Sequence, residues 1–162
     1  MNAGAKRATF EVLYFLHADS FPPPNFDQLI LKEIKAGNPA GCFKMKFDMD
    51  HWWLNLIGWF TKFNHKACRG GDQSLFIAKT LFEDLNAYNE NFVVYEDNEL
   101  IGRLYKNKVF KVIPEFISTS ARKYEEIGVW KLQFCFANIY LKRLTGASPE
   151  ELHQYYKNRI NP

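Results

Sequence analysis

Cysteines, long apolar runs and an excess of charge of one sign are all scarce in this sequence, and each scarcity excludes a class of protein. Cys42, Cys68 and Cys135 are odd in number and have no short paired spacing, which argues against a disulfide framework and a zinc site. No run reaches the roughly 18 apolar residues that span a bilayer, and residues 1–7 are too polar and too short for a secretory signal. We therefore expect a cytoplasmic protein.

Charge of neither sign dominates. The chain has 21 Lys and Arg against 18 Asp and Glu, a net charge of +3, and the basic residues are scattered. This pattern argues against a nucleic-acid partner but suits a diphosphate ligand or the anionic inner face of a membrane. Aromatic residues, by contrast, are abundant at 17%. They exceed what a core of this size needs, so we expect some of them to line a site or cover an interface.

The length of 162 residues allows one hydrophobic core, and no repeat or linker divides the chain. We therefore expect a single α/β domain over residues 1–162. Its predicted strands are residues 12–16, 42–47, 74–77 and 110–113. Its predicted helices are residues 25–36, 51–60, 80–85 and 123–144, one that opens at 95–100, and a last one starting at Ser148–Pro149, where a capping box meets a proline at the first helical position.

Three of the strands carry specific expectations. Residues 12–16 form an unbroken apolar run closed by turn residues, which is typical of a strand buried on both faces in a parallel sheet. Residues 42–47 alternate in polarity and predict a half-exposed strand. Pro114 is expected to end the strand at 110–113, because proline cannot donate a ladder hydrogen bond.

Asp19 is the first candidate for chemistry. It follows the apolar strand, at the end where open α/β sheets bind their ligands. His17 lies two residues earlier, so strand periodicity directs both side chains the same way. A carboxylate at this place can hold Mg²⁺ or Mn²⁺ against a diphosphate. The alternative is that Asp19 only caps the turn before three prolines.

Two further groups are ambiguous by themselves. Glu96 and Asp97 open a predicted helix, where acids either complement the helix dipole or, facing a cleft, act as a general base. The loop from Gly70 to Gln73 lets backbone approach a ligand closely, although a tight turn explains the paired glycines equally well.

Four short motifs follow one another along the chain: FLHADS at 15–20, GDQSLF at 71–76, EDNEL at 96–100 and SAR at 120–122. In this order they resemble the family-2-type inverting glycosyltransferases of the GT-A fold, and a bacterial subgroup in particular. The resemblance covers residues 2–156. It implies the C-terminal part of a GT-A fold, a mixed sheet flanked by helices. It also implies transfer of a sugar from a nucleotide-diphosphate donor to an acceptor hydroxyl with inversion.

The resemblance assigns the catalytic and metal-binding roles. Asp19 matches the aspartate that bridges Mg²⁺ or Mn²⁺ to the donor diphosphate, and His17 stands where many relatives carry another aspartate of the metal motif. Asp97 matches the general base that takes the proton of the acceptor hydroxyl, and Glu96 would orient that site.

The resemblance also assigns substrate contacts. Gly71, Asp72 and Gln73 match the loop beside the acceptor and the sugar, and Arg122 is expected to face the diphosphate and counter the charge of the leaving group. The donor sugar, the nucleotide and the acceptor cannot be read from the sequence, and a lipid-linked acceptor is one option.

Enzymes of this type begin with a βαβ segment that holds the base and ribose, whereas this chain starts just before the metal-binding strand. We therefore expect a truncated, partial domain whose strand at 12–16 exposes an open edge, and we predict a homo-oligomer. A single monomeric species in sedimentation would contradict that prediction. The rival hypothesis is a catalytically inactive remnant that acts as a binding or membrane-peripheral protein.

The aromatic segment at 51–63 leaves three alternatives open. It can be core, a subunit interface, or a surface that rests on a membrane or grips a lipid-linked acceptor through Trp52, Trp53 and Trp59.

Overall fold

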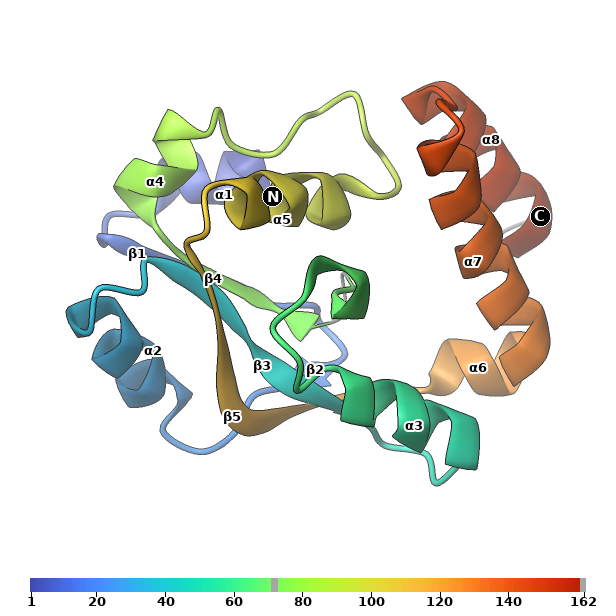
Figure 1. Ribbon diagram of the computed structural model, residues 1–162, viewed down its shortest axis with the longest axis horizontal. Helices are drawn as coiled ribbons and strands as arrows, with labels where there is room; N and C mark the ends of the chain where they lie inside the picture. The colour runs from blue at the N-terminus through green and yellow to red at the C-terminus, as the bar shows by residue number, and fades with distance from the viewer. Residues whose placement is uncertain (71–72, 161–162) are drawn as a thin grey trace. The chain divides into compact units, whose positions relative to one another are not determined.

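A mixed five-stranded sheet forms the centre of the first of two compact units into which the chain divides (Figure 1). The computed structural model describes residues 1–70 and 73–160. The first unit comprises residues 1–88 and 97–120. Its strands are β1 (Val12–Phe15), β2 (Ser20–Phe21), β3 (Ala40–Phe47), β4 (Leu75–Ala78) and β5 (Phe110–Thr119). They lie in the order β1-β4-β3-β5-β2.

Strand directions in this sheet are mixed. The pair β3–β5 is parallel, whereas β1–β4, β3–β4 and β2–β5 are antiparallel. Helices cover the sheet on both sides (Figure 1). The predicted α/β class, with a mixed sheet flanked by helices, is therefore confirmed.

The main core lies between the sheet and three helices, α1 (Asn2–Arg7), α4 (Lys79–Asp84) and α5 (Glu96–Lys106). Leu13 of β1 points into this core together with Leu100 and Ile101 of α5. The next residue, Tyr14, points to the other face, where its ring stacks on Phe26 of α2 (Phe26–Lys35) at a centroid distance of 5.3 Å. The sheet is thus a central layer between α2 and the other three helices.

The prediction of a parallel environment for the first strand is wrong. β1 pairs with β4 alone among the described residues, and that pair is antiparallel. The apolar run arises because Leu13 and Tyr14 each meet a helical layer, so both faces are covered without parallel neighbours. β1 is therefore an edge strand, and its outer backbone edge pairs with no strand that the structure describes.

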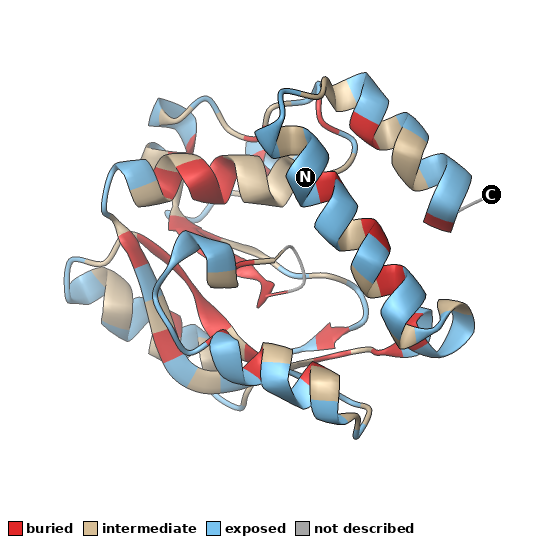
Figure 2. Cartoon of the chain, turned by 45° about the vertical axis from the view of Figure 1, so that its right-hand side comes forward, coloured by how far each residue is buried: buried red, intermediate tan, exposed pale blue. Residues whose placement is uncertain are grey.

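Two expectations about the central strands are also wrong. β3 is largely buried rather than half-exposed, because it lies between β4 and β5 (Figure 2). β5 does not end at Pro114. Its register against β3 passes from Ile113 opposite Phe43 to Phe116 opposite Lys44, which leaves Pro114 in a bulge that needs no N–H donor.

Helix α3 (Trp52–Phe60) packs directly on β3. Gly58 makes this approach close, because a Cβ there would lie 2.9 Å from the carbonyl oxygen of Met45. The turn after α3 is fixed by Thr61, whose hydroxyl accepts from the Met45 N–H at 2.9 Å and donates to the Gly58 carbonyl at 2.6 Å. A short 3-10 helix, η1 (Lys66–Cys68), follows.

The second unit comprises residues 89–96 and 121–162. It contains α6 (Arg122–Ile127), α7 (Val129–Leu144) and α8 (Pro149–Ile160). The single helix predicted at 123–144 is wrong, because Gly128 adopts φ +93° and separates α6 from α7. Phe92, Ile139 and Leu152 form the core of this unit.

The capping box predicted for the last helix is confirmed. The Ser148 N–H donates to Glu151 Oε2 at 2.8 Å, and the Glu151 N–H donates to Ser148 Oγ at 3.2 Å. No helix among the described residues has the length and apolar character that a bilayer crossing requires.

Candidate functional site

A cavity of about 670 Å³ runs along β1 within the first unit. This volume lies within the range of small-molecule sites. Its walls come from α1, from the whole of β1 and the three residues after it, and from the first turns of α5. The polar side chains among its lining residues are those of Arg7, Thr9, Tyr14, His17, Ser74 and Asp97. The edge of the sheet at β1 therefore carries a largely apolar cavity with a few polar side chains in its walls.

Two of the predicted site residues, 80 positions apart in sequence (97 − 17), meet at this cavity. His17 Nε2 lies 3.8 Å from Asp97 Oδ2, and the side chains are 38% and 18% exposed. The distance is longer than a hydrogen bond but within ion-pair range for a protonated imidazole. Asp97 reaches the cavity because α5 packs over β1 through Leu100 and Ile101. Both groups stay accessible to a ligand.

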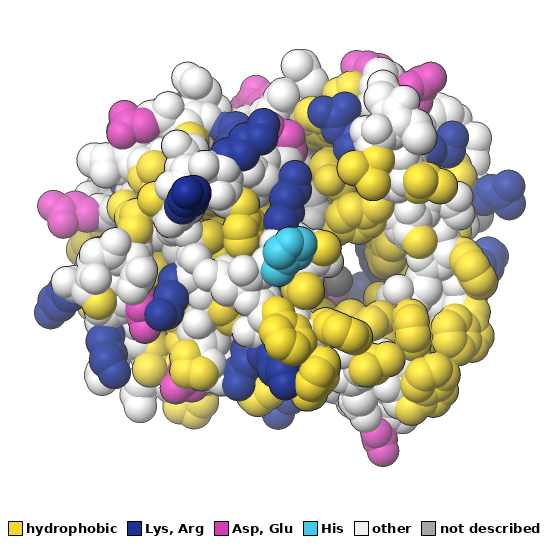
Figure 3. Space-filling model, in the orientation of Figure 1, with side chains coloured by type: hydrophobic (Ala, Val, Ile, Leu, Met, Phe, Trp, Pro, Cys, Tyr) yellow, Lys and Arg dark blue, Asp and Glu magenta, His cyan; other side chains and the backbone are white. Residues whose placement is uncertain are grey.

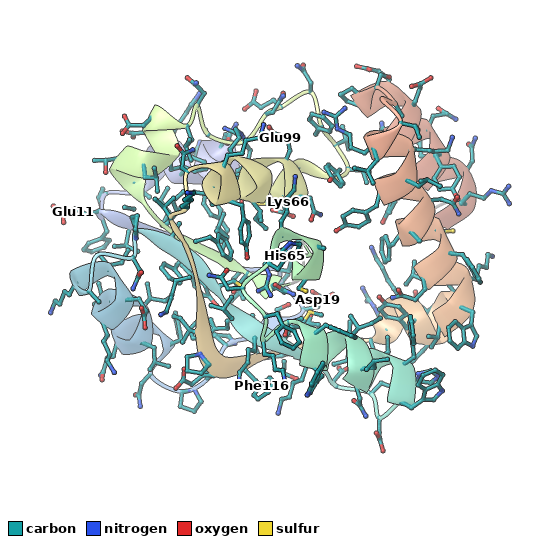
Figure 4. The ribbon with its side chains drawn as sticks, viewed as in Figure 1. Glu11, Asp19, His65, Lys66, Glu99 and Phe116 are labelled. Carbon is teal, nitrogen blue, oxygen red and sulfur yellow. The ribbon has the colours of Figure 1, made fainter. Side chains whose placement is uncertain are left out.

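Asp19 lies in the turn between β1 and β2, and it is exposed. Figure 4 shows Asp19 and Glu11 at opposite ends of β1. Backbone bonds fix the turn: the Ser20 N–H donates to the His17 carbonyl at 3.1 Å, and the Ser120 N–H donates to the Asp19 carbonyl at 3.1 Å. The strand ends at Phe15, so the strand alternation that we used to align His17 with Asp19 does not extend to them.

Gln73 is buried, with only 2% of its surface exposed. Its side-chain oxygen accepts from the Cys42 thiol at 3.6 Å, and its side-chain nitrogen donates to the Cys68 carbonyl at 2.9 Å. The amide that we expected to contact substrate is thus hydrogen-bonded within the protein. Gly71 and Asp72, which belong to the same predicted loop, lie outside the described residues.

Arg69 joins Gln73 in a buried polar cluster at the base of that loop. Its guanidinium donates to Cys42 Sγ at 3.0 Å and to the carbonyls of Thr61 and Phe63 at 2.5 and 2.6 Å. Burial raises the pKa of the Cys42 thiol to about 11, although Arg69 acts in the opposite direction. The thiol is therefore neutral at physiological pH. The hydrogen bonds of the cluster fix Arg69 and Gln73, one at each end of the predicted loop.

Glu96 and Arg122 belong to the second unit. Glu96 is the first residue of α5, and Tyr95 before it has φ +76°, a left-handed conformation that is costly for an aromatic residue. Arg122 opens α6 and lies 3.9 Å from Glu126, with both side chains well exposed. An exposed i,i+4 pair of this kind contributes little to stability.

Three polar residues of the cavity, Arg7, Tyr14 and Ser74, were given no individual role from the sequence. Arg7, in the last turn of α1, brings a cation to the cavity wall. The Tyr14 hydroxyl donates to Ser74 Oγ at 3.2 Å, and burial raises the pKa of Tyr14. Ser74 adopts φ +61°, in the left-handed region that non-glycine residues seldom occupy. Strained backbone of this kind is a signal of functional sites that a sequence does not display.

No group of three or more His, Cys, Asp or Glu side chains gathers for metal binding among the described residues. No protein-family model matches the chain, and no curated protein is significantly similar to it.

Proposed function

We propose that the chain is part of a metal-assisted glycosyltransferase of the GT-A fold, with the cavity along β1 as its donor site. The meeting of His17 and Asp97 at this cavity carries the proposal. The resemblance assigned a role to each of these residues separately. The cavity places the Asp97 carboxylate and the Arg7 guanidinium in the wall of one hollow of about 670 Å³, which supports a site for a ligand with both hydroxyl and anionic groups.

Asp97 is the proposed general base. In the transfer step its carboxylate takes the proton of the acceptor hydroxyl while the acceptor oxygen forms a bond to the anomeric carbon. The bond from that carbon to the diphosphate oxygen breaks on the opposite side, and its electron pair leaves with the nucleoside diphosphate. The Asp97 side chain is 18% exposed, so an acceptor hydroxyl can reach its carboxylate for this proton transfer.

The leaving diphosphate needs positive charge. Arg7 lines the cavity and is the proposed counter-charge from this unit. Asp19 fits a divalent cation, because its exposed carboxylate offers the oxygen ligand that Mg²⁺ and Mn²⁺ prefer. His17 is the second proposed ligand, and a cation bound there would neutralise the diphosphate. We further propose an acceptor that is lipid-linked and a homo-oligomeric assembly.

Isothermal titration calorimetry and product analysis test this function. We expect the chain to bind nucleoside diphosphates and nucleotide sugars in the presence of Mn²⁺, and Asp97→Asn to abolish transfer or hydrolysis while donor binding persists. Asp27→Asn, at an exposed carboxylate on α2, is the matched control and should change neither. Absence of nucleotide affinity would favour the alternative of a non-catalytic binding protein. Nucleotide binding with full turnover in Asp97→Asn would exclude Asp97 as the base.

A further inference from the structure

Helix α3 exposes an apolar face where a surface helix ordinarily exposes a polar one. The side chains of this face follow one another at positions i, i+4, i+7, i+8 and i+11, along the helix and the turn after it. They are Trp52, Leu56, Trp59, Phe60 and Phe63, with exposed fractions of 63, 37, 50, 44 and 43%. We call these five residues the aromatic stripe. Leu54 and Gly58 are buried on the opposite face of α3.

Three rings at the C-terminal end of the aromatic stripe form one continuous patch. The ring of Trp59 lies 5.2 Å from those of both Phe60 and Phe63, measured between centroids. The Lys62 ammonium lies over the Trp59 ring, 3.5 Å from its centroid. Figure 3 shows hydrophobic side chains gathered over α3, with Lys or Arg side chains among them. The patch therefore combines flat aromatic surface with a cation at its margin.

Positive charge concentrates at the C-terminal end of the stripe. Lys62 is exposed there, and Lys46 is exposed on β3 beside Gly58 of α3. Neither lysine forms an ion pair with a carboxylate among the residues that the structure describes. The acidic residues near the helix, Asp48 and Asp50, precede its first turn at the other end.

We propose that the aromatic stripe docks on an anionic phospholipid surface, with α3 lying in the plane of the interface. Trp and Phe rings favour the boundary between acyl chains and headgroups, and flanking lysines attract acidic lipids. A helix of nine residues, Trp52–Phe60, is too short to cross a bilayer, so it can lie on one but not span it. The inference does not depend on the proposed sugar transfer.

Vesicle co-sedimentation tests this surface with the whole chain. The vesicles contain phosphatidylcholine alone or phosphatidylcholine mixed with phosphatidylserine. We expect binding to the mixed vesicles. Trp59→Ser and Phe60→Ser should each weaken it by at least about tenfold, the effect of removing one inserted aromatic side chain. Phe21→Ser removes a ring that is 69% exposed outside the stripe, and should leave binding unchanged.

Charge reversal gives a second, independent comparison. Lys62→Glu should weaken binding to the mixed vesicles by about 30-fold, because each unit charge near an anionic surface contributes about fivefold. Lys35→Glu makes the same charge change at an exposed position on α2 and should have a much smaller effect. The far-ultraviolet circular dichroism of every variant must match that of the parent chain.

Three results would overturn the proposal. One is no binding to either vesicle. Another is that Trp59→Ser and Phe60→Ser bind the mixed vesicles as tightly as Phe21→Ser does. The third is concentration-dependent self-association that the stripe substitutions abolish while vesicle binding persists, which would identify a second copy of the chain as the occupant.

Discussion

Replacing Arg69 tests whether the buried polar cluster supports the first unit. Arg69 is 4% exposed, and its guanidinium donates to the carbonyls of Thr61 and Phe63 and to the Cys42 thiol. Arg69→Met keeps an apolar stem of similar length but removes all of these donors. A lost hydrogen bond from a charged group costs about 1.5–3 kcal/mol, and relief of the buried charge returns part of that. We expect a net loss of about 2–4 kcal/mol in the free energy of unfolding.

Urea denaturation followed by circular dichroism measures this loss. Because the chain has two units, hydrogen–deuterium exchange is needed to locate it. Exchange should accelerate around residues 61–69 and in β4. Arg69→Lys should be intermediate, because an ammonium cannot reproduce the planar set of donors. Lys35→Met, at an exposed cation, should cost less than about 0.5 kcal/mol. A cost for Arg69→Met no greater than that of this control, or faster exchange confined to residues 121–160, would show that Arg69 does not support the first unit.

Two other predictions concern the same unit. Gly41→Ala should destabilise it by about 3 kcal/mol or more in urea denaturation, because the new Cβ would lie 2.1 Å from the Lys111 carbonyl oxygen. Gly4→Ala, where no atom lies within 4 Å, should be neutral or slightly stabilising. The raised pKa of Cys42 favours the folded state below about pH 9, and this contribution should be lost as the pH rises toward 11. Cys42→Ala should therefore flatten the alkaline fall in stability, and an alkaline limb unchanged from that of the parent would contradict this.

Features that depend on local sequence were predictable. The last helix begins at Pro149 because Ser148 and Glu151 satisfy each other's backbone N–H groups, and both partners lie within four residues. Pro114 misled us for a related reason. Proline excludes a regular ladder position, but the sequence does not show that β5 bulges at Pro114 and then resumes its pairing with β3.

Features that depend on distant partners were not predictable from one sequence. The polarity of Gln73 suggested a ligand contact, but its partners Cys42 and Cys68 become visible only when β3 and η1 meet the loop. His17 and Asp97 were each singled out, yet nothing in the spacing between them indicated a separation of 3.8 Å. The role of the outward face of α3 was left open, because a helix that is apolar almost all round is compatible with core, interface and membrane.

The discontinuous second unit limits how the chain can be divided. Phe92 is 6% exposed and packs with Ile139 and Leu152, yet it comes from residues 89–96, inside the sequence of the first unit. Truncation after Ser120 would remove α6–α8 but leave Phe92 without its core, as a protease-sensitive apolar loop. No single cut therefore yields two autonomous fragments. Limited proteolysis of the intact chain should accordingly release neither unit whole after one cleavage.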